Sequence, residues 1–480
     1  MRWLSRFPPL LSRAVHGDHI RQFALNDETH LLSLLHQHPS RRPSLQIHSH
    51  LITSGLHRYR MSRGGMLLWN TLICRYSLEC FPSDALHVYQ YMLFFCAADL
   101  PTDSFTFSFL IKACGVSSLS TTGEQLHSLV LKNGHALGVY VDTALVDMYS
   151  SFGALADARK VFDEMPERNL VSWNVMITGF TKWGEMESAR LLFERMPNRN
   201  VISWTGLIEG YTQVKKPEEA LSLFRRMAKD IQPSEITVLA VVPAISDIVA
   251  LRKGETLHAY CIKEGLDSRD VRVENSLIDM YAKCGSVKNS LQVFDGMGKR
   301  TNLVSWNSVI SGFASNGMAE KAVGFFQRME REKITPNHVT FLNLLSACNH
   351  GGLVEEGIRL FASMVHTYQI LPETKHYGCF IDMLGRAGKL EEAEEVIAGM
   401  PVVANAIVWR TLLGCCSKHG EVEIGEKAMR RIMELEEGQG GDYAILSNML
   451  IEAGRFADAE NVRNLLSETN VGKIPGLSLT

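Results

Sequence analysis

The sequence lacks any long apolar run. Its longest apolar stretch, residues 236–251, contains Pro243 and Asp247 and is too short to cross a bilayer, so no membrane partner is expected. Proline and glycine, at 15 and 37 of 480 residues, are too few for a fibrous or low-complexity chain. A chain of this length instead predicts several domains or one long array.

Closely spaced cysteine motifs such as C-x-x-C are also missing. The ten cysteines are isolated except for Cys415 and Cys416, no C-x-x-C occurs, and no cysteine follows Cys416. This argues against a disulfide framework or a zinc ribbon and indicates a reducing compartment, with most cysteines as small core residues. Metalloprotease, phosphate-loop and serine-hydrolase motifs are absent as well. We therefore expect no catalytic residue, no metal and no cofactor, and predict that the chain is not an enzyme.

The chain has little net charge, and the charge is unevenly distributed. The total is −3, which alone does not suggest a nucleic-acid binder. Residues 1–65, however, hold nine arginines, no lysine and three acidic residues, a net charge of +6 that leaves −9 for the rest. The start, MRWLSRFPPLLSRAV, has no acidic residue and no long apolar core. It predicts an organelle transit peptide over residues 1–30, with a plain disordered leader as the alternative.

What the sequence does contain is repetition. VDMYSSFGALADARKVFDEM (146–165) recurs as IDMYAKCGSVKNSLQVFDGM (278–297) and as IDMLGRAGKLEEAEEVIAGM (381–400). A tryptophan pattern, LVSWN, occurs at 170–174 and again at 303–307. The offsets between copies agree only if the chain is a run of units of about 31–38 residues, and ten such units fill residues 66–405.

Each unit predicts two helices. In residues 170–200 the first helix is expected from about Trp173 to Lys182, where Gly184 breaks it, and Pro197 ends the second helix. One hairpin cannot bury its apolar face alone, but stacked hairpins can. The sequence therefore predicts an all-α fold, a right-handed α-solenoid of helix-turn-helix repeats with a concave inner face.

These units resemble the pentatricopeptide repeat (PPR), through the pattern V-x-[SY]-W-N-x-[ML]-I-x-G-[FY]…G…A…[LV]-F…M. The alternating unit lengths are similar to the P-L-S subclass of plants, and the segment after residue 405 is similar to the E-type extension of that subclass. Its end, KIPGLS (473–478), departs slightly from the usual K-x-P-G-C-S. The resemblance implies a degenerate L-type repeat at 31–65, ten PPR units of P, L and S type at 66–405, and an E-type extension of two further helical hairpins at 406–480.

The resemblance implies sequence-specific binding of single-stranded organelle RNA, with one base read by the fifth and last residues of each repeat. Carried over to this chain, the pairs and the bases they imply are Asn70 with Asp103 for U, Thr143 with Asn169 for A, Asn174 with Asn200 for C or U, Thr205 with Ser234 leaning to purine, and Asn275 with Asn302 and Asn307 with Asn337 for a pyrimidine. The implied site is U-n-A-Y-R-n-Y-Y-n-n. Apolar second residues that would hold the bases flat are Leu67, Val171, Ile202 and Val304.

The remaining pairs are expected to read little, because leucine and glycine cannot hydrogen-bond a base edge. They are Ser108 with Gly138, Leu239 with Asp270, Leu342 with Glu373, and Gly378 with Asn405. A simpler interpretation competes for the asparagines, since Asn in the first turn of a helix is often only a cap or a polar surface residue. The recurrence of Asn at the same position in four units favours the reading role.

Some members of this family end in a zinc-dependent cytidine deaminase, the DYW domain, with the signature H-x-E…P-C-x-x-C. The chain has one H-x-E, at His419-Gly420-Glu421, but no cysteine follows it, so zinc would lack two ligands. We expect this segment to be a turn between helices.

The resemblance thus implies a site-recognition factor for C-to-U RNA editing that recruits a deaminase in trans. Its expected partners are deaminase-bearing PPR proteins and multi-site editing factors. The arginine-rich leader favours the mitochondrion, with the chloroplast as the alternative. Two other functions stay open: a tetratricopeptide-like scaffold that binds proteins, and a PPR factor for RNA processing or stability.

Overall fold

The computed structural model describes residues 63–78, 82–95, 103–134, 138–436 and 439–468. The predicted leader, and nearly all of the predicted degenerate repeat, lie outside the described residues. Every regular element in these ranges is a helix, and none of the helices is long and apolar enough to cross a membrane. The chain forms two compact parts, residues 1–233 (the N-terminal part) and residues 234–480 (the C-terminal part).

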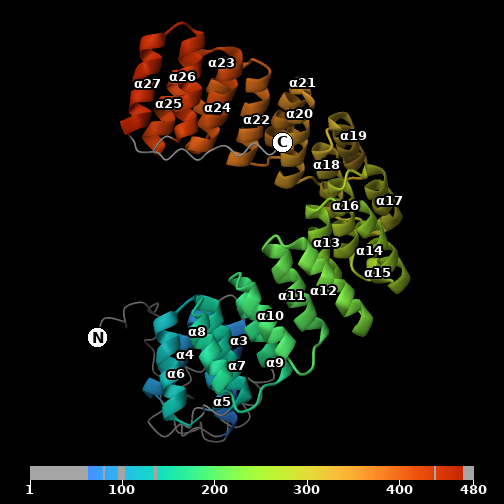
Figure 1. The fold of residues 1–480 in the computed structure, drawn as a ribbon, viewed down its shortest axis with the longest axis vertical. Helices are drawn as coiled ribbons and strands as arrows, with labels where there is room; N and C mark the ends of the chain where they lie inside the picture. The colour runs from blue at the N-terminus through green and yellow to red at the C-terminus, as the bar shows by residue number, and fades with distance from the viewer. Residues whose placement is uncertain (1–62, 79–81, 96–102, 135–137, 437–438, 469–480) are drawn as a thin grey trace, which may run out of the picture. The chain divides into compact units, whose positions relative to one another are not determined.

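The described helices of the N-terminal part form five hairpins (Figure 1). In chain order they are α3 (Arg63–Leu78), α4 (Pro82–Phe95), α5 (Ser104–Ser117), α6 (Ser120–Lys132), α7 (Val139–Phe152), α8 (Leu155–Glu164), α9 (Leu170–Lys182), α10 (Met186–Arg195), α11 (Val201–Gln213) and α12 (Pro217–Asp230).

The described helices of the C-terminal part continue the same alternation. They are α13 (Glu235–Asp247), α14 (Leu251–Glu264), the short α15 (Leu266–Arg269), α16 (Val271–Lys283), α17 (Val287–Met297), α18 (Leu303–Ser315), α19 (Ala319–Arg331), α20 (His338–Gly351), α21 (Val354–His366), α22 (Thr374–Arg386), α23 (Leu390–Ala398), α24 (Ala406–His419), α25 (Val422–Leu435), α26 (Gly440–Glu452) and α27 (Phe456–Glu468). The segment from residue 406 therefore holds four helices among the described residues.

Within each part the helices form two layers. The first helix of each hairpin packs against the first helices of its neighbours, as α7 does with α5 and α9, and α18 does with α16 and α20. The second helices cover this layer, each contacting its own partner and the first helix of the next hairpin. The prediction of an all-α fold of helix-turn-helix repeats is confirmed.

Hairpin 170–200 shows how the sequence sets the helix ends. Gly184 takes a left-handed conformation, with φ of +77°, in the turn between α9 and α10, a backbone geometry that glycine adopts without strain. The prediction for the start of the first helix was wrong by three residues: α9 begins at Leu170 rather than near Trp173. The reason is the side chain of Asn169, which caps the helix by accepting a hydrogen bond from the backbone N–H of Ser172 at 2.9 Å.

The recurring tryptophan belongs to the core between hairpins. Trp204 packs edge-on against Phe193 of the preceding hairpin, with ring centroids 4.7 Å apart, and Trp306 packs in the same way on Phe294 at 4.9 Å. Trp204 and Trp306 are almost completely buried. Each contact joins one unit to the next, so the repeated tryptophan is explained by packing.

Glycine within the first helices allows the inner layer to pack closely. A Cβ atom added to Gly312 of α18 would lie 2.7 Å from the Cβ of Ala282 in α16. Because real Cβ atoms essentially never come this close, a larger residue at position 312 would push the two helices apart.

The described cysteines are free thiols, and five of them are buried. Burial raises the pKa of Cys114 to about 11 and the pKa of Cys261 to about 12. These two thiols are protonated at neutral pH and act as small core residues.

Candidate functional site

The last residue of most units caps the first helix of the next unit. Asn302 accepts a hydrogen bond from the backbone N–H of Ser305 at 3.0 Å, and Asn337 accepts one from Thr340 at 3.1 Å. Asn169, Asn200, Ser234 and Asp103 cap their helices in the same manner. The caps fix these side chains at one end of the helix layer.

The fifth residues have a different position, one turn inside the first helix, where they cap nothing. Asn174, Asn275 and Asn307 lie in α9, α16 and α18, and each is almost buried between its own helix and the next unit. These three asparagines therefore do not cap their helices, and their role in reading a base stays a prediction.

Three of the predicted Asn–Asn pairs are brought together by the fold. The Nδ2 group of the fifth residue points to the Oδ1 atom of the last residue, at 3.4 Å for Asn174 and Asn200 and 3.2 Å for Asn307 and Asn337. The pair of Asn275 with Asn302 has the same arrangement at 3.5 Å. Each pair places two short polar side chains side by side, as a reader of base edges requires.

The predicted pair with a carboxylate is also formed. Asn70 Nδ2 donates to Asp103 Oδ2 at 2.9 Å, while Asp103 Oδ1 accepts from the backbone N–H of Thr106 at 2.8 Å. The Asp103 side chain therefore acts as an acceptor on both oxygens, and only the amide of Asn70 offers hydrogens.

Of the two pairs with a fifth-position threonine, the pair of Thr143 with Asn169 differs from the asparagine pairs. The hydroxyl of Thr143 donates to the backbone oxygen of Val139 at 2.6 Å, and among the described residues no hydrogen bond joins it to Asn169. Thr205 lies in the N-terminal part and Ser234 in the C-terminal part. Their predicted pairing stays a prediction.

The predicted stacking residues are strongly exposed for apolar side chains. The exposed fractions of Val171, Ile202 and Val304 are 57%, 64% and 57%. Each is the second residue of its helix and lies next to the fifth and last residues that are predicted to read a base, here called the reading pair. Each therefore offers an apolar surface to the flat ring of that base. The side chain of Leu67 lies outside the described residues.

The sequence interpretation missed further exposed residues at the second position of a unit. Phe105 and Tyr140 are exposed, and their rings are stacked with centroids 6.3 Å apart and planes 29° apart. Ile236, Val339 and Ile407 are exposed at the equivalent place. The signal was available in the sequence, since Phe105, Tyr140, Ile236 and Val339 are the second residues of their units.

Side chains in the remaining pairs are engaged elsewhere. Ser108 donates to the backbone oxygen of Ser104 at 2.8 Å. Asp270 forms an ion pair with Arg272 at 2.7 Å, and the hydrogen bonds from Arg272 hold the pKa of Asp270 below its usual value. These local bonds occupy the polar groups that a base edge would need.

The H-x-E segment forms a turn. His419 is the last residue of α24, Gly420 has a φ of +74°, and Glu421 precedes α25. Among the described residues, no group of three or more His, Cys, Asp and Glu side chains lies close enough to hold a metal ion. The segment joins two helices.

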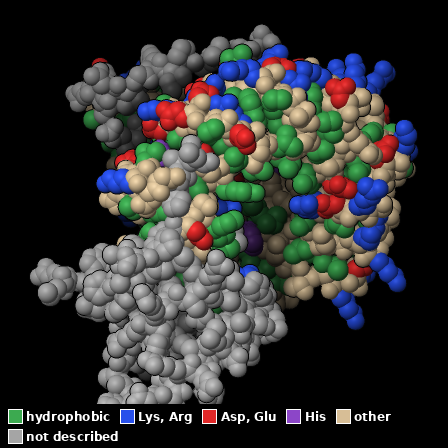
Figure 2. All heavy atoms as spheres, turned by 90° about the horizontal axis from the view of Figure 1, so that it is seen from below, with side chains coloured by type: hydrophobic (Ala, Val, Ile, Leu, Met, Phe, Trp, Pro, Cys, Tyr) green, Lys and Arg blue, Asp and Glu red, His purple; other side chains and the backbone are tan. Residues whose placement is uncertain are grey.

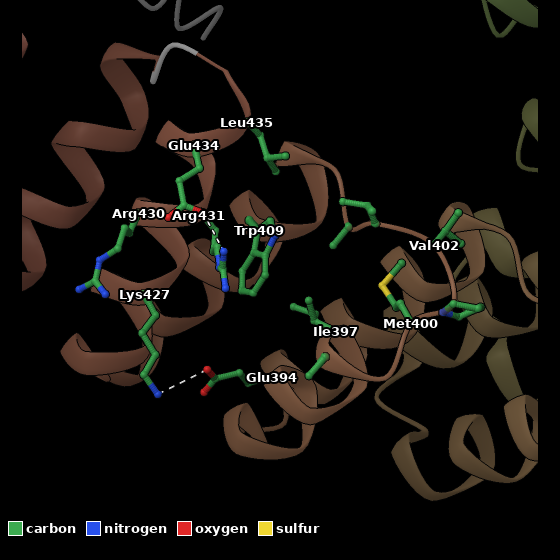
Figure 3. Close-up of a pocket in the computed structure, with 14 residues that line it drawn as sticks. Glu394, Ile397, Met400, Val402, Trp409, Lys427, Arg430, Arg431, Glu434 and Leu435 are labelled. Carbon is green, nitrogen blue, oxygen red and sulfur yellow. Dashed lines mark hydrogen bonds and ion pairs between the residues drawn. The ribbon is translucent and has the colours of Figure 1, made fainter.

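A groove of about 690 Å³ lies at the junction of α23, α24 and α25 (Figure 3). Trp409 and Ile397 line its apolar wall, next to the exposed Val402 and Val403. On the α25 side, Lys427 pairs with Glu394 at 3.4 Å. The groove combines this apolar wall with a partly basic rim.

Comparison with known proteins identifies the repeats. The model described as "PPR repeat" matches residues 143–170, 171–201, 202–230, 275–301, 339–366 and 375–402, and "PPR repeat family" matches 301–350. The chain is 45% identical over 465 residues, covering 94% of this chain and 92% of the relative, to an Arabidopsis thaliana protein named pentatricopeptide repeat-containing protein At1g09220, mitochondrial. The chain belongs to the PPR family. It also carries an E motif, matched at residues 419–480.

Other PPR proteins are similar over most of the chain. The pentatricopeptide repeat-containing protein OGR1, mitochondrial, of Oryza sativa subsp. japonica is 35% identical over 480 residues, covering 94% of this chain and 77% of the relative. Among solved structures, PPR10 in complex with an 18-nt psaJ RNA element aligns with a TM-score of 0.67 and 15% identity. That alignment covers 88% of this chain and 65% of PPR10, and it confirms the solenoid fold.

Proposed function

We propose that this PPR protein binds single-stranded RNA of an organelle in a sequence-specific way and selects a cytidine for C-to-U editing. The observation that carries the proposal is the repeated site: a paired fifth and last residue, next to an exposed apolar second residue. It recurs at Asn174 with Asn200 and at Asn307 with Asn337, beside Val171 and Val304. A base can lie flat on the apolar side chain while its edge faces the paired amides.

The relatives support an organelle and an RNA ligand. The names of At1g09220 and OGR1 place those proteins in mitochondria, and the name of a further Arabidopsis thaliana relative, At1g59720, is chloroplastic/mitochondrial. PPR10, which shares the fold, was solved with a bound RNA element. We place this chain in the mitochondrion, with the chloroplast as the alternative, and assign residues 1–30 to the transit peptide.

For the editing step, we propose that residues 406–480 recruit a deaminase in trans, carried by another PPR protein and assisted by multi-site editing factors. Among the described residues, no cluster of His, Cys, Asp and Glu side chains could hold zinc at His419 and Glu421, and we therefore assign the chemistry to the partner. The groove at Trp409 is a suitable contact, because Val403 on its rim is 86% exposed. A partner segment with apolar and acidic side chains would suit this groove: the apolar side chains would contact its apolar wall, and the acidic ones the basic residues of α25.

The direct test is sequencing of organelle RNA from a plant line that lacks the protein. We expect at least one cytidine that is edited in the normal line to stay unedited, downstream of a sequence that fits U-n-A-Y-R-n-Y-Y-n-n. Unchanged editing together with shortened or degraded transcripts would assign the protein to RNA processing or stability. Unchanged organelle RNA would favour the protein-binding scaffold.

Point variants separate RNA binding from recruitment. Val403→Asp in the groove is expected to reduce editing in complemented plants without changing RNA affinity, since it places a charge on the apolar contact. Leu191→Asp is the matched control, because Leu191 is 67% exposed on α10, far from the groove in sequence. Normal editing by Val403→Asp would contradict the proposed contact, and loss of RNA binding would show that it disturbs the fold.

A further inference from the structure

We propose that Ser305 and Thr340, the third residues of two units, are positioning residues that fix the orientation of the amide read in the preceding unit. The inference rests on the proposed function, because it concerns how the fifth residues present themselves to a base. It adds a specificity determinant that lies outside the fifth and last positions.

The geometry around Ser305 defines the direction of each hydrogen bond. The backbone N–H of Asn302 donates to Ser305 Oγ at 3.1 Å, so a lone pair of the hydroxyl is used and its hydrogen is free to be donated. That hydrogen is directed to Asn275 Oδ1 at 2.7 Å, the shorter of its two contacts, since Asn302 Oδ1 lies at 3.1 Å. Ser305 is completely buried, so water does not compete for this bond.

The same arrangement recurs one unit later. The backbone N–H of Asn337 donates to Thr340 Oγ1 at 3.1 Å. Thr340 Oγ1 donates to Asn307 Oδ1 at 2.7 Å, a shorter contact than the 3.1 Å to Asn337 Oδ1. Thr340 is also completely buried. The fold thus builds the network from either hydroxyl residue, serine or threonine.

A third case lies near the start of the described residues. The hydroxyl of Thr106 lies within hydrogen-bonding distance of both Asn70 Oδ1 and Asp103 Oδ1, while the Nδ2 group of Asn70 donates to Asp103. In all three units the amide oxygen of the fifth residue therefore points to a hydroxyl of the next unit.

This network leaves the fifth residue one group with which to hydrogen-bond a base. Its oxygen is held by the hydroxyl, and one of its two amide hydrogens is directed to the last residue, so the other hydrogen is the group left for a ligand. Rotating the amide of Asn275 by half a turn would break the bond to Ser305 and set two oxygen atoms, those of Asn275 and Asn302, against each other. The acceptors that a pyrimidine presents include its O2 atom, so the network holds in place the donor on which the proposed pyrimidine preference of this unit depends.

The chain contains its own control at Ser203. This residue forms the same capping box with Asn200, but its hydroxyl donates to the backbone oxygen of Asn200 at 2.9 Å. The oxygen of Asn174 is buried and has no hydrogen-bond partner among the described residues. Ser203 and Ser305 thus share the capping role and differ in the contact with the fifth residue.

The experiment compares Ser305→Ala with Ser203→Ala in the full chain. RNA oligonucleotides carrying a pyrimidine or a purine opposite the affected unit are titrated against each variant. For Ser305→Ala we expect the pyrimidine preference at the unit of Asn275 to fall about fivefold, the value of one ordinary hydrogen bond. For Ser203→Ala, the preference at the unit of Asn174 should stay within twofold of the unmodified protein.

Variants of Thr340 give an independent check. Thr340→Ser keeps the hydroxyl and should retain the pyrimidine preference at the unit of Asn307, whereas Thr340→Val keeps the shape and should lose it. Equal changes for Ser203→Ala and Ser305→Ala, or equal weakening on every RNA, would overturn the proposal and reduce the hydroxyls to helix caps. Absence of any sequence preference in the unmodified protein would instead refute the proposed function, before any variant is made.

Discussion

Replacement of Arg300 by methionine tests how the structure holds a reading pair in place. Arg300 contacts Glu274 with both terminal nitrogens, at 2.8 Å and 2.7 Å. Glu274 is only 4% exposed and immediately precedes Asn275, while Arg300 lies two residues before Asn302. The ion pair therefore ties together the two segments that carry one reading pair.

The expected loss follows from burial. Removing one partner of a fully buried ion pair costs about 3–5 kcal/mol, and the partial exposure of Arg300 reduces our expectation for Arg300→Met to about 2 kcal/mol. The remaining carboxylate of Glu274 would be buried without its cation. The double variant Glu274→Gln, Arg300→Met removes that charge and should recover most of the loss.

The sign of the pH dependence provides the sharper test. Burial raises the pKa of Glu274, and Arg300 opposes this shift, so without Arg300 the pKa of Glu274 rises further. The charged form is then disfavoured in the folded state, and stability falls as the pH rises from about 4.3, the pKa of an unfolded glutamate, through the raised value. The loss caused by Arg300→Met should be largest near pH 8 and small near pH 4.5.

The assay is unfolding by heat or urea, followed by circular dichroism, with hydrogen exchange of α16 to locate the effect. The double variant is measured beside the single one at both pH values. A loss of the same size at pH 4.5 and pH 8, or no recovery in the double variant, would refute the reasoning from a buried charge.

Burial raises the pKa of Asp142 to about 6, so Asp142→Asn should stabilise the protein by about 1–2 kcal/mol at pH 7.5. It should have almost no effect below about pH 3, where the carboxyl group is protonated in both the folded and the unfolded state, and equal melting shifts at both pH values would contradict this. Residues 66–480 carry a net charge of −9, and on the face seen in Figure 2 basic and acidic side chains are mixed over the described part, so the logarithm of the RNA affinity should fall with the logarithm of salt less steeply than for a protein making ~6–10 phosphate contacts. A steep slope would show concentrated basic contacts. Asn70→Thr should shift the preferred first base from U toward G in oligonucleotide binding, because Asp103 stays while the amide is lost, and equal weakening on all sequences would make Asn70 structural.

Much of the fold could be predicted from the sequence, because its signals are local. Gly184 marks the turn between α9 and α10, and the apolar spacing of the second helices shows which face is buried. The start of α9 could not be derived from apolar spacing, since a polar residue, Asn169, determines it. The other units could be predicted from the repetition, because each repeat folds in the same way as its neighbours.

The candidate site was predictable only in part. Family resemblance identified Asn275 and Asn302, and the structure brings them within hydrogen-bonding distance. The contact from Ser305 to Asn275 joins residues 30 positions apart and depends on a hydroxyl orientation that no sequence pattern records. The exposed second residues Phe105 and Tyr140 could have been found by taking the second residue of every unit as a stacking candidate.

The central claim is that successive units read successive bases through their fifth and last residues. It is tested most directly by selecting RNA from a fully random pool with the purified full chain and sequencing the bound fraction. We expect enrichment of U followed two positions later by A, then a pyrimidine, and two adjacent pyrimidines opposite the units of Asn275 and Asn307. A bound fraction without a shared sequence, or with one that does not follow this order, would contradict it.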